Sequence, residues 1–236
     1  MASPAKRFWK TTSMVKGDEG WMVHLDRRPV KTPAGYPLAL RGEALAEYIL
    51  REWDAQEEHI NPATMPMFRY VVTAIDRVTP QRDDVIDQIL GYTKNEMLCY
   101  RTPEQAELAE EQNRHWQPCL DWAKQNYDLS FEVSTGIMPI NQPEGSVILA
   151  ANILTNMDDF RLAGVFNLIS ISGSFVVGLA ITDGKLSPQE GFEVAFLEEL
   201  WQAKKWGSDE EAEDRRNRLK QDMIETKQYL SLLEIA

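Results

Sequence analysis

The chain has 236 residues, of which 43% are hydrophobic, and a formal net charge of −12 at pH 7. A chain of this size can bury one sizeable core without disulfides or a structural metal. The negative charge excludes nucleic acid and anionic membrane as partners, because the field of the whole chain repels both.

Short runs rich in aromatic and β-branched residues alternate with turn signals over the first forty residues. This pattern indicates a small antiparallel sheet. The expected strands are residues 7–15, 21–25, 29–32 and 36–40. We therefore predict a small β-hairpin domain over residues 1–42.

From Glu43 onward the apolar residues recur with a helical period. The expected helices are residues 43–58, 66–78, 82–100, 104–127, 144–157, 158–170, 174–182, 189–206 and 209–233. Residues 129–143 are expected to form an extended loop or a short strand. The predicted fold class is therefore α+β and mainly α, with a larger α-helical domain over residues 43–236.

Residues 162–182 carry no charge, which meets the length of a membrane-spanning helix, roughly 20 residues. Several serines and glycines dilute their hydrophobicity, and residues 171–174 have the pattern of a break between two helices, with Ser174 able to cap the second. A buried helical hairpin is therefore the better prediction.

Glu199 interrupts the apolar face of the helix expected over residues 189–206. The start of this helix is well specified, because Ser187 and Glu190 form a capping box around Pro188. At about 100° per residue, Glu199 falls among Phe192, Ala195, Phe196, Ala203 and Trp206. A carboxylate at such a position needs a partner or must be neutral.

Motifs for cofactor or metal chemistry are missing. Gly178, Gly184 and Lys185 have the wrong spacing for a phosphate-binding loop, and the three histidines are too scattered for zinc. Cys99 and Cys119 are interpreted as buried free thiols in a reducing compartment. We expect no cofactor, no metal and no enzyme.

The residues also resemble a known family, the assembly chaperones of the F(1) sector of ATP synthase that hold the alpha subunit (the "ATP twelve" chaperones). The resemblance rests on residues 20–21, 25–33, 43–46, 52–56, 73–76 and 98–101, on Gln112, Trp116, Pro118 and Trp122, and on residues 173–174, 197–199, 201–202 and 206–207. Phe68 and Glu96 depart from the family's usual residues.

The resemblance implies a small β domain joined to a larger helical one and a non-enzymatic, nucleotide-independent role. That role is to bind newly made alpha subunit and cover its aggregation-prone surface until the beta subunit replaces it. The family is cytoplasmic in bacteria and lies in the matrix of mitochondria. Because the residues before Phe8 hold no secretory or transit-peptide pattern, the bacterial cytoplasm is predicted, and we expect a monomer.

The seven tryptophans and nine methionines include candidates for contact with a partner chain. Trp201 is expected as the first anchor because it lies nearly opposite Glu199 on the helical wheel. The full set of predicted partner-binding residues is Glu198, Glu199, Trp201, Gln202, Met67 and Phe68.

Two roles for Glu199 remain open at this stage. It either pairs with a buried arginine, Arg69 or Arg101, and braces its helix, or it meets a basic group of the client. Two other function classes also remain: a helical adaptor that pairs through residues 209–233, and an enzyme with Glu199 as a general acid in an apolar pocket.

Overall fold

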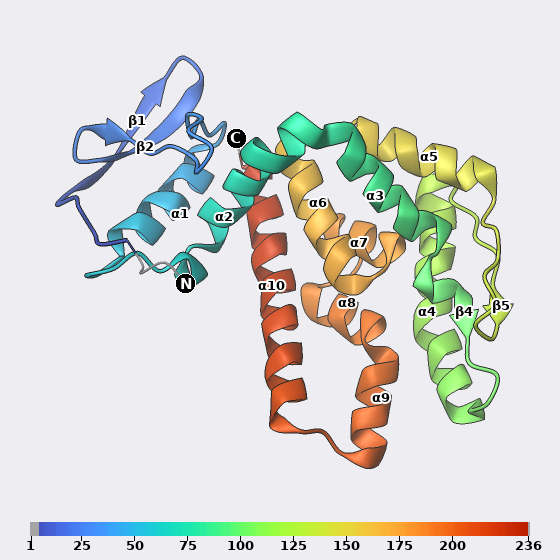
Figure 1. Ribbon diagram of the computed structural model, residues 1–236. Helices are drawn as coiled ribbons and strands as arrows, with labels where there is room; N and C mark the ends of the chain where they lie inside the picture. Colours follow the sequence, from blue (N-terminus) through green and yellow to red (C-terminus); the bar gives the residue numbers. More distant parts are fainter. Residues whose placement is uncertain (1–4, 236) are drawn as a thin grey trace. The chain divides into compact units, whose positions relative to one another are not determined.

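The computed structural model describes residues 5–235 and divides them into two compact units (Figure 1). Unit 1 consists of residues 5–82, 159–164 and 228–235, and unit 2 consists of residues 83–158 and 165–227. Helices predominate, and a small antiparallel sheet lies near the N-terminus, which confirms the predicted fold class. The domain boundary predicted between residues 42 and 43 stays a prediction.

The sheet of unit 1 contains β1 (Thr12–Gly17), β2 (Gly20–Leu25) and β3 (Arg28–Pro29) in that order. β1 and β2 form a hairpin in which Gly17 pairs with Gly20. The fourth expected strand is reduced to isolated bridges, one of them between Trp21 and Leu40. Gly20 has a φ of 128°, and a Cβ there would lie 2.4 Å from the Leu40 carbonyl oxygen, so this crossing needs glycine.

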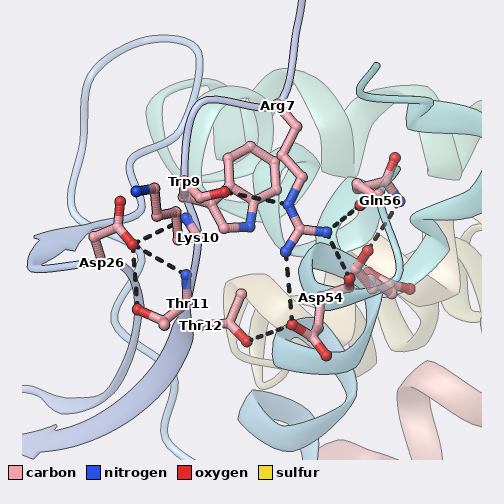
Figure 2. Close-up of polar contacts among 9 residues, drawn as sticks. Arg7, Trp9, Lys10, Thr11, Thr12, Asp26, Asp54 and Gln56 are labelled. Carbon is pink, nitrogen blue, oxygen red and sulfur yellow. Dashed lines mark hydrogen bonds and ion pairs between the residues drawn. The ribbon is translucent and has the colours of Figure 1, made fainter. Parts of the chain in front are cut away.

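Polar contacts hold the first strand to the helix that follows the sheet (Figure 2). That helix is α1 (Glu43–Asp54), which packs against β1 and β2. Arg7 donates to the Asp54 carbonyl at 3.0 Å and to the Gln56 carbonyl, and Thr12 donates to the Asp54 carboxylate at 3.0 Å. On the other side, Asp26 accepts the amides of Lys10 and Thr11, and these bonds lower the pKa of its carboxyl.

Unit 1 is completed by α2 (Pro66–Thr73) and by short pieces of α6 (Asp159–Ser172) and α10 (Glu210–Glu234). After α2, residues 74–78 form one π-helical turn, in which the hydrogen bonds span five residues instead of four. The helix predicted over residues 66–78 is therefore not α-helical throughout. The rings of Tyr70 and Tyr229 lie 5.1 Å apart, and Arg82 forms an ion pair with Asp159. Segments distant in the sequence therefore share this core.

The helices of unit 2 follow the predicted order, with most ends displaced by one to six residues. They are α3 (Arg82–Lys94), α4 (Ala106–Tyr127), α5 (Glu144–Thr155), α6 (Asp159–Ser172), α7 (Phe175–Thr182), α8 (Pro188–Ala195), α9 (Leu197–Trp206) and α10 (Glu210–Glu234). The strands β4 (Tyr100–Arg101) and β5 (Ser134–Thr135) form a short parallel pair.

The uncharged stretch forms the predicted helical hairpin. α6 ends before Gly173, whose φ is 70°, and the Ser174 hydroxyl accepts the Val177 amide at 3.0 Å as the cap of α7. All eight residues of α7 are buried, and the helix contacts α4 and α8. Among the described residues, no helix has the length and apolar content that a membrane crossing requires.

Candidate functional site

The helix predicted over residues 189–206 is broken at Phe196. The capping box of Ser187 and Glu190 is confirmed, but Phe196 leaves the helical conformation and its ring stacks on Phe192 at 4.5 Å. In an unbroken helix the Val194 carbonyl would accept the amide four residues later. Here it accepts the indole nitrogen of Trp116 on α4, at 2.9 Å. This long-range bond lies at the junction of α8 and α9.

Glu199 therefore does not occupy the dry apolar face that the sequence predicts. Its side chain is 36% exposed, and its two carboxylate oxygens form ion pairs with Arg216 at 3.1 Å and Arg215 at 3.3 Å on α10. The predicted pairing with Arg69 or Arg101 is thus corrected to a pairing with neighbours on α10. The sequence alone could not place these arginines beside Glu199, because local patterns do not determine the path of the turn between α9 and α10.

The two arginines first considered have other surroundings. Arg101 is buried and donates to the side chain of Asn113 at 3.0 Å and to the Leu98 carbonyl. Arg69 lies in unit 1, with its guanidinium 5.2 Å from the ring of Tyr70. The ion pairs of Glu199 are formed instead with Arg215 and Arg216 of its own unit.

The two expected contact residues on α2 differ in exposure. Met67 is buried at 2% exposure in the core of unit 1, so it does not offer its side chain to a partner chain. Phe68 is half-buried and lies edge-on to Trp53 at 5.1 Å. The carboxylate of Glu52 accepts the amides of both Met67 and Phe68, at 2.7 and 2.8 Å, and thereby caps the start of α2.

α9 presents aromatic side chains on the surface of unit 2. Trp201 is half-buried, with the ammonium of Lys205 4.4 Å above its ring. Trp206, which the sequence placed on the buried face, is 65% exposed and lies edge-on to Trp201 at 5.6 Å. Gln202 is exposed beside them. These side chains form a surface that is apolar in the middle and polar around it.

A groove of about 710 Å³ lies between α4 and α9, and we call it the α4–α9 groove. Leu197, Leu200 and Trp201 supply its apolar lining. Its charged and polar lining consists of Glu107, Glu110, Glu111, His115, Glu193, Lys204 and Lys205. Lys205 is paired with Glu107 at 3.4 Å, and the lining as a whole is acidic.

A second pocket, of about 580 Å³, lies on the other side of α9 in unit 2. We call it the Arg101 pocket. It is lined by Met97, Tyr100, Arg101, Thr102, Pro103, Trp116, Gly136, Ile137, Ala195, Phe196, Glu198 and Glu199. Glu198, one of the predicted contact residues, accepts a hydrogen bond from the buried amide of Gln112. Of the predicted residues on α9, Trp201 lines the groove, Glu198 and Glu199 line the Arg101 pocket, and Gln202 lines neither.

Glu96 is a buried acid that the sequence did not single out for chemistry. It accepts the amides of Leu98 and of Val176 in the first turn of α7, each at 3.2 Å. Burial raises the pKa of this carboxyl to about 7, although these hydrogen bonds oppose the change. The contacts show a capping role, and across residues 5–235 no group of three or more His, Cys, Asp and Glu side chains is placed to hold a metal.

Comparison with known proteins gives consistent results. A family model described as "ATP12 chaperone protein" matches residues 6–124. The mitochondrial protein atp12 of Schizosaccharomyces pombe is 26% identical, with 93% of this chain and 81% of that protein covered.

Two solved structures have the same fold. The crystal structure of Atp12 from Paracoccus denitrificans superposes with a TM-score of 0.92 at 33% identity, covering 97% of this chain and 98% of that one. A point mutant of the same organism's Atp12p gives 0.93 at 32% identity, covering 98% and 100%.

Proposed function

The chain belongs to the ATP12 chaperone family, and from this premise we propose that it assists assembly of the F(1) sector of ATP synthase. In this proposal it binds unassembled alpha subunit and covers an aggregation-prone surface until the beta subunit takes its place. The role requires no cofactor and no bond-making step. We further propose that it acts as a monomer in the bacterial cytoplasm, as similarity to the Paracoccus protein suggests, and that eukaryotic relatives act in the mitochondrial matrix.

The observation that supports client binding most directly is the α4–α9 groove with its neighbouring tryptophans. Trp201 lines the groove, and Trp206 is 65% exposed beside it. Large aromatic side chains bordered by charge are typical of protein-binding surfaces, where a few anchors supply most of the binding energy. The proposed contact residues at the groove are therefore Trp201 and Trp206, with Gln202 beside them, while Glu198 and Glu199 are proposed to contribute from the Arg101 pocket. Phe68, half-buried in unit 1, is a weaker candidate, and Met67 is removed because it is buried.

Two alternatives receive less support. The apolar stripe of α10 is turned into the protein, since Met223, Thr226 and Leu230 are at most 1% exposed, so a free pairing surface for an adaptor is not available there. Glu199 is 36% exposed and paired with two arginines, whereas the general-acid hypothesis requires an apolar pocket around it.

The proposal can be tested with purified alpha subunit diluted from denaturant in the presence of this protein. Light scattering should fall as the chain is added at equal concentration, and a stable complex should elute from a gel-filtration column. Serum albumin at the same concentration serves as the control. Equal scattering with the two proteins would contradict the proposal.

A further inference from the structure

Two apolar side chains at the Arg101 pocket are largely exposed to solvent. Ile137 is 93% exposed and Met138 is 74% exposed. The chain just before them is anchored, because the Gly136 amide donates to the Arg101 carbonyl at 2.8 Å and β5 pairs with β4. Isolated exposed apolar residues are common, but two adjacent ones at the mouth of a pocket indicate a contact surface.

Arg101, in the same pocket, retains an unused hydrogen-bond donor. The residue is 5% exposed and its guanidinium lies 5.2 Å from the ring of Trp116. Nε and Nη1 donate to Asn113 and to the Leu98 carbonyl, whereas Nη2 is buried and has no partner among the described residues. A buried donor without an acceptor destabilises a protein, so an acceptor supplied from outside would remove that cost.

The residues around Nη2 of Arg101 limit which kind of acceptor group can bind there. Glu198 lines the same pocket and is bonded to the neutral amide of Gln112, so its charge repels an incoming carboxylate, whereas a peptide carbonyl carries no net charge. The remaining lining is largely apolar, with Met97, Trp116 and Phe196, and the volume of about 580 Å³ accommodates a large aliphatic or aromatic side chain.

We propose that the Arg101 pocket binds an extended, uncharged segment of the client. One apolar side chain of that segment enters the pocket, its peptide carbonyl accepts from the Arg101 guanidinium, and its next residues cover Ile137 and Met138. This deepens the proposed function and rests on it. It adds a second contact region, separate from the α4–α9 groove, that selects unfolded or partly folded client by its exposed backbone.

A photo-crosslinking experiment tests where the client lies. Benzoyl-phenylalanine is placed at Ile137 in one variant and at Ile148 in another. Ile148 is also exposed, at 54%, and belongs to α5 of the same unit, but it lines neither pocket. Each variant is irradiated with isolated alpha subunit, and the adducts are mapped by mass spectrometry. We expect an adduct at position 137, in a stretch of the alpha subunit without charged residues, and little at position 148.

The substitution Ile137→Asp measures the contribution of this surface. It should weaken binding of alpha subunit about tenfold or more, as loss of an interface anchor does, while Ile148→Asp should leave affinity unchanged. Both side chains are exposed, so both variants should keep the wild-type melting temperature. Equal crosslinking at the two positions, or equal affinity of the two variants, would overturn the pocket proposal while wild-type protein still keeps alpha subunit soluble. If wild-type protein fails to keep it soluble, the proposed function itself fails.

Discussion

The carboxylate of Glu199 lies 3.1 Å from the guanidinium of Arg216, and this contact ties α9 to α10. The side chain of Arg216 is only 10% exposed, and its second nitrogen donates to the Ser208 hydroxyl. Five residues before Glu199, near the end of α8, the Val194 carbonyl accepts the indole N–H of Trp116 on α4. The start of the helix that carries Trp201 and Trp206 is therefore held by contacts with both α10 and α4.

Replacing Glu199 by Gln should lower the free energy of unfolding by about 1 kcal/mol, because the pair is partly exposed and screened while Arg216 is left without its counter-charge. Urea denaturation followed by circular dichroism gives the value. Glu213→Gln is the matched control, since Glu213 is an exposed acid on α10. If both variants are equally stable, the contact does not brace α9.

Truncating the exposed indole in Trp206→Ala should weaken capture of alpha subunit, with a loss of about 2 kcal/mol or more if Trp206 is an anchor. Because the side chain is 65% exposed, the melting temperature should change little. Binding is measured by titration with labelled alpha subunit. Tyr36→Ala, which removes another exposed aromatic ring in unit 1, should bind as wild type does. Unchanged affinity in Trp206→Ala would exclude it from the contact surface.

Trp116→Phe removes the indole hydrogen bond together with part of a buried ring, and it should destabilise the protein by about 2 kcal/mol or more, because the buried Val194 carbonyl loses its donor and a cavity remains. The control is Trp122→Phe on the same helix, which removes the same ring volume from a half-buried side chain. Chemical denaturation compares the two variants. A larger loss in Trp122→Phe would show that ring volume, not the hydrogen bond, sets the cost.

Stability should fall as the pH rises through neutrality, because of Glu96. Its pKa is raised from 4.5 to about 7 in the folded state, so the folded chain holds a proton that the unfolded chain has released. The stabilisation is complete below pH 4.5 and is lost as the pH passes 7, and it amounts to at most about 3 kcal/mol. Denaturation at pH 5 and pH 8 measures the difference.

The variant Glu96→Gln isolates this dependence, since Gln cannot titrate but keeps one carbonyl acceptor for the amides of Leu98 and Val176. Its stability should differ less between pH 5 and pH 8 than that of wild type. A difference equal to that of wild type would assign the pH dependence to other groups.

The sequence predicted the elements whose signals are local. The capping box of Ser187 and Glu190 and the break before Ser174 both depend on neighbours within a few residues, and the structure confirms them. The break at Phe196 was missed because it has no local signal, and the bond beside it comes from Trp116, 78 positions from Val194. The helical wheel placed Glu199 in an apolar face for the same reason, since it assumed one continuous helix.

The candidate site was predicted only in part. Trp201 is half-buried on the surface, as a side chain opposite the buried face would be, but whether it contacts a client stays a prediction. Met67 was misplaced because composition does not distinguish a flexible core residue from a flexible surface one. Ile137 and Met138 were overlooked, since two apolar residues in a loop rich in proline carry no periodic signal.

Unit 1 joins Tyr70 to Tyr229, and it includes residues 228–235 together with the N-terminal sheet. During translation, the core that the first eighty residues share with Tyr229 can close only after the segment around position 229 has been made and has left the ribosome. The growing polypeptide therefore spends its own synthesis with this core incomplete.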